Sequence, residues 1–495
     1  MMDRRDFIKK AALGLVGLSS GSLALLNTQR SFANTDLCST NAQHPLLFCI
    51  DANGAYDTTS FCDPLLGDDF QHDDILGDAS WFEGKRHGPK HRFAFYGPEH
   101  VKNVGPFHIA PQSISGGTQL SNGRTEGGTA SYYQVNGEDF FEKYQNDLVI
   151  VQGIDTQTNA HGVGQRYAWS GRLGVGAPHI GALWAAIRNK DIYGDTSTHS
   201  LPMAFTSTGG YDATMGIVPI ARASKPGALL NLTEPFAYPL SLSDNVAHPY
   251  VSNAIIDQVL NYQNSRTERM LAQANLPPHV QRNIQKLRDA RLSEKDLKPL
   301  ADTWPSMESH TNGDEGKEKM ALLIAGMKSG ICNAAMLQAG GFDTHSDHYS
   351  LHLPLLQKLF ETIDFVATHL QSQGLWERSL ILVHSDFGRT RLNGSADGKD
   401  HWPITSFMMM GGLIEGNREF GGTYVDPNPS AQQPKSGMMP RAVNLETLAL
   451  DDGGSFITPS HIHYTIRDML GINCHPLAEQ FKLPSEFQTV LPLFG

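Results

Sequence analysis

Short, continuously apolar runs alternate with longer stretches of helical periodicity along most of the chain. The apolar runs cover residues 45–50, 147–154, 201–206, 331–338, 379–384 and 404–410. Helical spacing of apolar residues covers 140–144, 179–190, 317–328, 349–373 and 461–470. Strands that are apolar on both faces are typical of a sheet buried on both sides. The alternation predicts an α/β fold, with a mainly parallel central sheet and helices on both faces.

Two segments interrupt this pattern. Residues 68–128 are polar and glycine-rich with weak periodicity, which predicts a long, loop-rich insertion. Residues 253–300 are rich in charged and amide side chains with periodic apolar ones, which predicts a helical insertion that could cap the core. A chain of 495 residues has room for two or three domains, or for one α/β domain with insertions. We expect one domain over residues 34–495.

The first 33 residues have the layout of a targeting segment. Arg4 and Arg5 begin a twin-arginine pattern, a weakly apolar stretch rich in Gly, Ala and Ser follows, and Ser31-Phe32-Ala33 supplies the small residues of a cleavage site. An N-terminal membrane anchor is the alternative, but the stretch is short and weakly hydrophobic for a bilayer span. We therefore predict a signal peptide over 1–33, passage through the twin-arginine translocase, a periplasmic mature protein and no stable membrane insertion.

Charge and cysteine usage exclude several classes of function. The formal charge is −12 and no dense Lys/Arg stripe is present, so nucleic acid is not an expected partner. The five cysteines have no C-x-x-C spacing, which argues against structural zinc and iron–sulfur sites. A redox enzyme has little support because the sequence contains no haem, flavin or iron–sulfur motif.

Candidate metal ligands follow several of the predicted strands. Asp51, Asp343 with His345, and Asp386 each follow one, while His401 precedes the last. In an open parallel sheet, ligands bind beyond the carboxyl ends of the strands. Carboxylate and imidazole suit zinc, manganese or a similar divalent ion, so Asp343, His345 and His401 form a candidate mononuclear site. The alternative for each residue alone is a turn, a helix cap or a surface position.

His348 and His352 have the i, i+4 spacing of a helical metal-binding pair. The same spacing also fits one solvated helix face, and we leave both residues out of the metal set.

Three motifs give the chain a specific resemblance. Residues 340–346 read Gly-Gly-Phe-Asp-Thr-His-Ser, 385–390 read Ser-Asp-Phe-Gly-Arg-Thr, and 400–402 read Asp-His-Trp. Behind a twin-arginine leader, they resemble the bacterial exported family known as domain of unknown function fifteen-oh-one, which is placed in the alkaline phosphatase and sulfatase superfamily. The resemblance implies an alkaline phosphatase-like fold that holds one or two divalent metals (zinc, manganese, calcium or magnesium). It also implies a Ser, Thr or formylglycine nucleophile that attacks a phosphate or sulfate ester.

The resemblance also suggests roles for individual residues. By position, Asp343, His345 and His401 resemble one metal site, and Asp51 with Asp386 resemble part of a second. The superfamily commonly has histidine where this chain has Phe387, so we expect one metal site rather than two.

The remaining catalytic candidates also follow from the resemblance. Asp57 and His161 lie where the family carries polar residues that face the cleft. Thr58, Thr59 and Ser60 are the candidate nucleophiles, and the sequence does not choose among them. Thr58 is the one included in the predicted catalytic set. Arg389 could neutralise a small anionic ester, or it could form a structural salt bridge.

Two functions from different classes follow. The first is a periplasmic metal-dependent hydrolase of a phosphate or sulfate ester. The alternative is an exported, non-catalytic binding or assembly protein that retains the alkaline phosphatase-like fold. The second is favoured by Phe387 and by the absence of an obvious nucleophile.

Overall fold

A computed structural model describes most of the chain after residue 43. The described ranges are 44–66, 95–96, 101–110, 137–194, 201–223, 250–273, 275–277, 280–281, 283–284, 297–346, 348–392, 398–425 and 438–494. The predicted signal peptide and most of the predicted insertion over 68–128 lie outside these ranges. None of the helices in the described part has both the length and the apolar character needed to cross a bilayer.

The core of the molecule is an eight-stranded sheet in the order β14-β6-β13-β10-β1-β9-β7-β8. Its strands are β1 (Leu46–Asp51), β6 (Leu148–Asp155), β7 (Phe205–Ser207), β8 (Ile220–Arg222), β9 (Ala334–Gln338), β10 (Ser379–His384), β13 (Ile404–Met410) and β14 (Arg418–Gly421). Every neighbouring pair is parallel except the two that involve β13. The α/β fold with a mainly parallel sheet is therefore confirmed.

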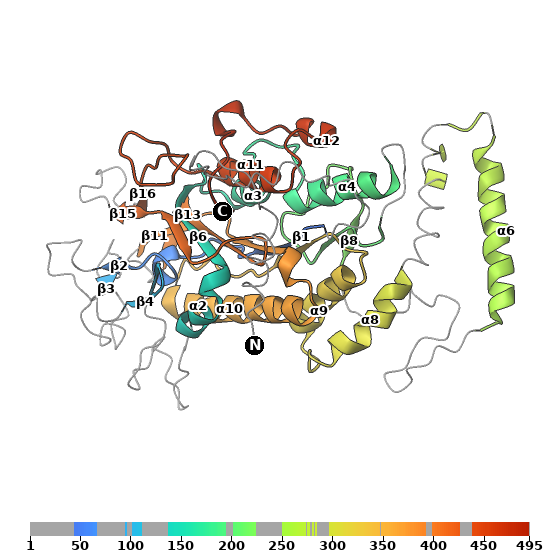
Figure 1. Cartoon of the computed structure of the whole chain (residues 1–495), viewed down its shortest axis with the longest axis horizontal. Helices are drawn as coiled ribbons and strands as arrows, with labels where there is room; N and C mark the ends of the chain where they lie inside the picture. Colours follow the sequence, from blue (N-terminus) through green and yellow to red (C-terminus); the bar gives the residue numbers. More distant parts are fainter. Residues whose placement is uncertain are drawn as a thin grey trace, which may run out of the picture.

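Helices cover both faces of this sheet, as the apolar runs predict. Figure 1 shows α2, α8, α9 and α10 on one face and α3, α4, α11 and α12 on the other. The first set spans Gly137–Tyr144, Lys298–Glu308, Glu315–Lys328 and His348–Ser372, and the second spans His161–Ser170, Ile180–Tyr193, Pro459–Met469 and Pro476–Glu479. Helix α3 has no counterpart among the helices expected from periodicity.

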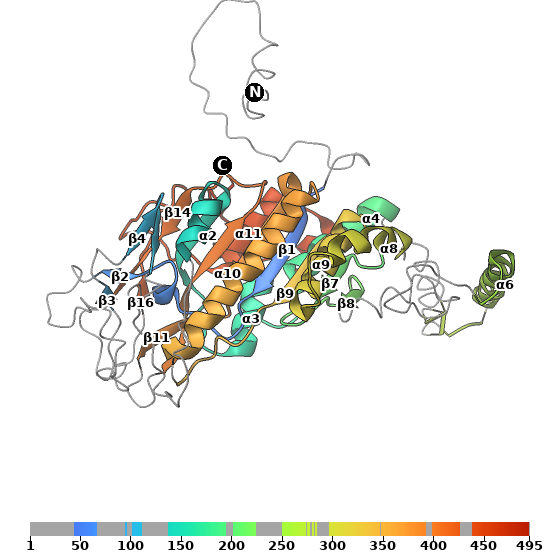
Figure 2. The same ribbon diagram turned by 90° about the horizontal axis from the view of Figure 1, so that it is seen from below.

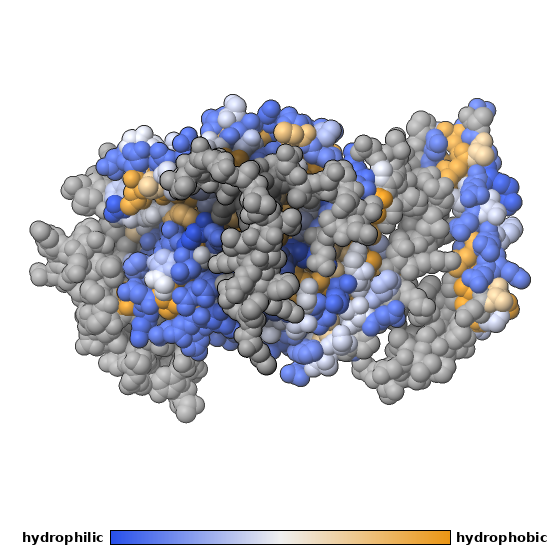
Figure 3. All heavy atoms as spheres, in the orientation of Figure 1, coloured by the Kyte–Doolittle hydropathy of each residue, from blue (hydrophilic) through white to orange (hydrophobic). Residues whose placement is uncertain are grey.

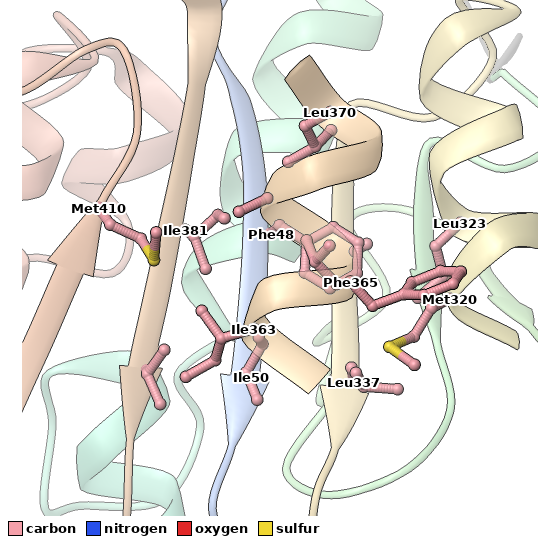
Figure 4. Close-up of a cluster of buried hydrophobic side chains, with 14 of the residues drawn as sticks. Phe48, Ile50, Met320, Leu323, Leu337, Ile363, Phe365, Leu370, Ile381 and Met410 are labelled. Atoms are coloured by element: carbon pink, nitrogen blue, oxygen red, sulfur yellow. The ribbon is translucent and has the colours of Figure 1, made fainter. Parts of the chain in front are cut away.

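Alternate residues of β1 divide the core into two apolar clusters. Phe48 and Ile50 point towards α10 and α9, where they share a cluster with Ile363 and Leu323 (Figure 4). Leu47 and Cys49 belong to the opposite cluster, with residues of α3, α4 and α11. Because side chains alternate across a strand, β6, β9, β10 and β13 likewise contribute to both clusters.

The direction of β13 decides where the polar residues meet. β13 pairs antiparallel with both β10 and β6, and its first residue, Ile404, lies opposite Asp155 at the end of β6. The start of β13 therefore lies at the same edge of the sheet as the carboxyl ends of β6, β10, β1 and β9. A residue that precedes β13 consequently joins residues that follow the other strands.

Shorter elements surround this framework. Four two-stranded ladders pair β2 (Leu65–Leu66) with β3 (Phe95–Tyr96), β4 (Lys102–Val104) with β5 (Phe107–Ile109), β11 (Gly388–Leu392) with β12 (Lys399–Trp402), and β15 (Thr423–Val425) with β16 (Met438–Pro440). Within the segment predicted as a helical insertion, α6 (Asn253–Leu271) stands apart from the sheet (Figures 1 and 2). Apolar side chains such as Ile255 and Val259 are exposed on it, and Figure 3 shows hydrophobic patches, in orange, along this helix.

Candidate metal centre

Three separate segments bring the candidate ligands to the carboxyl edge of the sheet. His161 is the first residue of α3, in the connection that follows β6. Asp343 and His345 lie in the loop between β9 and α10. His401 lies on β12, just before β13, and pairs with Arg389 of β11. The antiparallel direction of β13 thus brings His401 to the other three residues.

Two glycines allow these segments to approach closely. Gly54 has a φ of +107°, and a Cβ atom there would lie 2.5 Å from the backbone nitrogen of Asp343. A Cβ atom on Gly398 would lie 1.7 Å from the carbonyl oxygen of His345. With no side chain at Gly398, Lys399 N can donate to Thr344 O at 3.2 Å. The backbone of β12 therefore lies directly against the loop that carries Asp343 and His345.

The four side chains meet through one set of atoms. His401 Nε2 lies 3.0 Å from His161 Nε2 and 2.9 Å from His345 Nε2. Asp343 Oδ1 lies 3.0 Å from Nε2 of both His345 and His401, and Oδ2 lies 3.4 Å from His161 Nε2. Atoms of His161, Asp343 and His401 all lie within 4.8 Å of one another, as a shared cation requires.

Each imidazole is held by its outer nitrogen. Nδ1 of His161 pairs with Asp386 Oδ2, Nδ1 of His345 with Asp400 Oδ1 at 3.0 Å, and Nδ1 of His401 with the carbonyl oxygen of Asn159 at 2.8 Å. These partners only accept hydrogen bonds, so each Nδ1 carries the proton and donates it. In the neutral imidazoles, the three Nε2 lone pairs therefore point towards one another and towards the Asp343 carboxylate.

This donor set fits a divalent cation. Nitrogen and oxygen ligands about 2.0–2.1 Å from zinc lie roughly 3.3 Å apart in a tetrahedron, close to the separations found here. Outer-nitrogen hydrogen bonds to carboxylates and carbonyls are the arrangement that orients histidine ligands around metals. Without a cation, one imidazole would have to be protonated to separate the converging lone pairs.

The charge state of Asp343 suits the same role. Partial burial acts to raise its pKa, but the hydrogen bond from Arg389 and the Arg389 charge lower the pKa to about 2. The hydrogen bond to Asp386 raises the pKa of His161, against the opposing effect of burial. Asp343 is thus anionic at neutral pH and available as a ligand.

Arg389 is buried and holds the Asp343 carboxylate in place. Its Nε donates to Ala55 O at 2.9 Å, and its Nη1 donates to Lys399 O at 3.0 Å. Its Nη2 contacts Gly54 O, Phe342 O and Asp343 Oδ1, the last at 2.7 Å. Because backbone carbonyls occupy most of the guanidinium, the geometry favours the structural salt bridge over direct neutralisation of an ester.

Asp57 lies in a second, fully buried polar cluster. Its Oδ2 pairs with Lys399 Nζ at 2.6 Å and with His348 Nε2 at 3.0 Å, and its backbone N–H donates to His352 Nε2 at 2.9 Å. Burial opposes ionisation of Asp57, but the Lys399 charge and the His348 hydrogen bond hold its pKa well below the usual range. His348 and His352 therefore belong to this Asp57 cluster, and their side chains are buried.

The three candidate nucleophiles lie in the turn capped by Asp57. The hydroxyls of Thr59 and Ser60 donate to the Asp57 carboxylate at 2.7 and 2.9 Å. Thr58 is 6% exposed in the same turn. The geometry brings all three to the Asp57 cluster, and a nucleophilic role for Thr58 stays a prediction.

Asp51 and Asp386, the residues predicted for a second metal, have different surroundings. Asp386 Oδ1 accepts from Gly54 N at 3.1 Å, Ala55 N at 2.6 Å and Ser385 Oγ at 2.9 Å, while Oδ2 supports His161. Asp51 is buried behind the metal centre, and neither of its oxygens has a hydrogen-bond partner among the described residues. The described ligand group within 4.8 Å includes neither carboxylate.

Three features of the metal centre and the Asp57 cluster could not be read from the ligand spacing. The family resemblance predicts His161 only as a cleft-facing residue, although it lies in the connection that follows a buried strand, as Asp343 does. Asp400 stands beside His401 in the motif, yet its contact with His345 depends on the β11–β12 hairpin. The same is true of the contact between Lys399 and Asp57.

Comparison with known proteins adds the family. The model of the protein family of unknown function DUF1501 matches residues 121–432, which is more than half of the chain and includes all four candidate ligands. The chain belongs to the DUF1501 family. This confirms the family predicted from the three motifs. No curated protein matches the DUF1501 chain.

Several solved structures are similar to this DUF1501 protein at low identity. The PsFucS1 sulfatase from Pseudoalteromonas sp. is 10% identical, with a TM-score of 0.34, over 91% of this chain and 72% of that one. The lipoteichoic acid synthase LtaP from Listeria monocytogenes is 8% identical, with a TM-score of 0.30, over 90% and 76%. The phosphonate monoester hydrolase from Silicibacter pomeroyi is 11% identical, with a TM-score of 0.26, over 70% and 72%. At these TM-scores, the likeness carries no argument about activity.

Proposed function

We propose that this DUF1501 protein is a metal-dependent hydrolase of a phosphate or sulfate ester. The observation that carries the proposal is the convergence of three imidazole Nε2 atoms and the Asp343 carboxylate at one partly exposed point. The superfamily implied by the three motifs suggests the substrate class.

Some residues of the chain would bind the cation, and others would orient the side chains that bind it. His161, Asp343 and His401 would hold the cation, with His345 as a fourth ligand. Asp386, Asp400 and the Asn159 carbonyl keep the Nδ1 protons in place, so that the Nε2 lone pairs remain directed at the cation. Arg389 fixes the Asp343 carboxylate and favours its anionic form.

A bound divalent ion would polarise the ester oxygen and lower the pKa of an attacking water. The side chains of Asp343 and His345 are 45% and 46% exposed, so an anionic ester can approach from solvent. A free cationic side chain is not required for this approach, because the cation itself attracts the ester. With water as the nucleophile, the reaction does not require the hydroxyl of Thr58, which lies in the buried Asp57 turn.

One observation favours the non-catalytic alternative. If His345 binds together with His161, Asp343 and His401, four protein ligands complete a tetrahedral shell, as in structural zinc sites. Catalytic zinc sites commonly keep one position open for water or substrate. The candidate functions therefore differ in whether His345 stays bound during the reaction.

Turnover of aryl phosphate and aryl sulfate esters separates the two functions. The metal-loaded protein, its chelator-treated form and the His401→Ala variant would be assayed in parallel, with His310→Ala, an exposed histidine after α8, as the matched control. Chelator-sensitive turnover that is lost in His401→Ala and kept in His310→Ala supports the hydrolase. Bound metal without turnover on any ester supports the binding protein, and an absence of bound metal contradicts the hydrolase.

We also propose that the mature protein acts in the periplasm after twin-arginine export. The support is the Arg4-Arg5 pattern followed by the weakly apolar stretch and Ser31-Phe32-Ala33. Replacing both arginines by lysine is expected to leave the uncleaved precursor in the cytoplasm, as measured by cell fractionation. Unchanged processing and export of that variant would contradict the proposed route.

A further inference from the structure

A third group of polar atoms lies on the α3, α4 and α11 face of the sheet, buried within an otherwise apolar region. These atoms are Asp51 Oδ1 and Oδ2, Trp169 Nε1, His179 Nε2, His384 Nε2 and His463 Nδ1, and none has a hydrogen-bond partner among the described residues. The five residues are at most 1% exposed. We call them the Asp51 cluster.

The members of the Asp51 cluster are neighbours in space. Asp51 and His384 lie directly opposite each other in the parallel register of β1 and β10. The Trp169 ring centroid lies 5.4 Å from that of His179 and 6.5 Å from that of His384. His463 Nε2 pairs with the carbonyl oxygen of Ala168, next to Trp169, at 2.8 Å. The unpartnered atoms therefore surround one short stretch of α3.

The partnered nitrogen of each histidine fixes the role of the other nitrogen. His179 Nδ1 accepts from Gly181 N at 2.8 Å, so its Nε2 carries the proton and is a donor. His384 Nδ1 donates to Ser406 O at 2.9 Å and His463 Nε2 donates to Ala168 O, so His384 Nε2 and His463 Nδ1 are acceptors. Burial lowers the pKa of all three histidines, to between about 3 and about 4, which keeps each imidazole neutral.

The Asp51 cluster therefore combines donors and acceptors. Trp169 Nε1 and His179 Nε2 donate, while His384 Nε2, His463 Nδ1 and the Asp51 carboxyl accept. A metal cation cannot satisfy the two N–H donors, and the cluster contains no described ligand group within 4.8 Å. An anion would be repelled by ionised Asp51 and by the imidazole lone pairs. Water both donates and accepts, and it is the small ligand that matches this inventory.

We propose that the Asp51 cluster binds internal water between the sheet and helices α3 and α11. Each buried donor or acceptor left unsatisfied is strongly unfavourable, and buried water typically makes two to four hydrogen bonds to such groups. The water connects Asp51 of β1 and His384 of β10 to Trp169 of α3 and His463 of α11. The water thereby links helices α3 and α11 to the carboxyl ends of β1 and β10. Strand β10 ends two residues before Asp386.

The surroundings of Asp51 support water over direct pairing. Trp169 Nε1 and Asn53 Nδ2 point towards the Asp51 carboxyl, but neither reaches hydrogen-bonding geometry. A Cβ atom on Gly210, whose φ is +81°, would lie 2.7 Å from Asp51 Oδ2, so backbone closes one side of the carboxyl. Water can bridge the remaining side whether Asp51 is ionised or protonated.

A crystal structure of the full mature protein that resolves individual waters tests the proposal without any variant. The expected result is ordered water within hydrogen-bonding distance of Trp169 Nε1, Asp51 and at least one of the two acceptor imidazoles. A dry cluster with Trp169 Nε1 bonded directly to Asp51 would overturn it. An ion at metal–ligand distance from Asp51 would overturn it equally. None of these outcomes depends on the metal centre or on hydrolysis.

Magnetic relaxation dispersion, which counts long-lived internal waters, provides a second test. Trp169→Phe removes a donor of the Asp51 cluster, and the count is expected to fall. The matched control is Trp184→Phe, because Trp184 Nε1 already donates to Pro45 O at 3.1 Å. The control is expected to leave the count unchanged. Equal counts in the wild type and a folded Trp169→Phe variant would contradict the proposal.

Discussion

His345 of the metal centre and the histidines of the Asp57 cluster are close in sequence but differ in chemistry. His345 is 46% exposed, and because Asp400 binds its Nδ1, its Nε2 faces other imidazoles. His348, three residues later, has no exposed side chain, and its two nitrogens contact Thr344 and Asp57. The Asp57 cluster balances its own charge through Lys399. In the metal centre, three Nε2 lone pairs and the Asp343 carboxylate converge, and an added cation would be needed to balance them.

This difference shows that residue type alone does not mark a metal ligand. A histidine becomes a candidate ligand when one nitrogen is held by an acceptor and the other faces further ligands. A histidine with partners on both nitrogens instead supports the fold. Acidification, charge removal and loss of an orienting carboxylate should therefore affect the two clusters differently.

Acid should have the largest effect, through the buried histidines. Burial lowers the pKa of His179, His348, His384 and His463 to between about 3 and about 4, and that of His352 well below 6.5. Because the unfolded chain binds protons that these folded histidines do not, stability is lost as pH falls below 6.5. The five histidines together lose about 8 kcal/mol between pH 6.5 and 5.

Urea unfolding of the metal-free protein at pH 7 and pH 5 measures this loss. His161, Asp51 and Asp63 have the opposite sign, because their raised pKa values give stability that is present at low pH and lost as pH rises through the folded pKa. An equal free energy of unfolding at both pH values would show that the buried histidines are not neutral in the folded protein.

Removing the charge of Asp57 should have the next largest effect. Asp57→Asn leaves the Lys399 ammonium buried without its counter-charge, which typically costs about 3–5 kcal/mol. The matched variant is Asp343→Asn, where the carboxylate is 45% exposed and backbone carbonyls still hold the buried Arg389 guanidinium, so a smaller cost than for Asp57→Asn is expected for the metal-free protein. Denaturant unfolding checks both, and similar losses in the two variants would remove the distinction between the clusters.

Removing an orienting carboxylate should have a smaller effect, confined to metal binding. Asp400→Asn weakens the acceptor that holds His345 Nδ1, and outer-shell changes of this kind typically lower metal affinity about 10–100-fold. Competition titration with a chromophoric chelator measures the change. Asp364→Asn, which removes an exposed ion pair with Lys143, is the control and should leave the affinity unchanged.

Much of the fold could be predicted because its strands are apolar on both faces. The run over 379–384 became β10, and the run over 404–410 became β13. The antiparallel direction of β13 could not be predicted, because an apolar run has the same pattern in either direction. That direction brings His401 to the carboxyl edge, so the meeting of His401 with Asp343, predicted from ligand type and from placement next to strands, depends on a topology that the sequence does not reveal.

The same reasoning explains why the strand-end carboxylates have different roles. A strand end fixes the edge of the sheet but not the face towards which the side chain points. Asp343 follows its strand in an exposed loop, whereas Asp51 is the last residue of β1 and points into the buried layer with Leu47 and Cys49. The Asp386 carboxylate accepts hydrogen bonds from two backbone N–H groups and from the Ser385 hydroxyl. These environments depend on contacts between residues hundreds of positions apart, which spacing does not reveal.

The number of divalent ions bound per chain tests the metal centre most directly. Purified mature protein would be dialysed to equilibrium against zinc or manganese and analysed by elemental mass spectrometry, alongside Asp343→Asn and Asp57→Asn. One ion per chain in the wild type and in folded Asp57→Asn, and loss of that ion in Asp343→Asn, is the expected result. No bound ion in the wild type, or the same ion content in Asp343→Asn, would contradict a metal site at His161, Asp343 and His401.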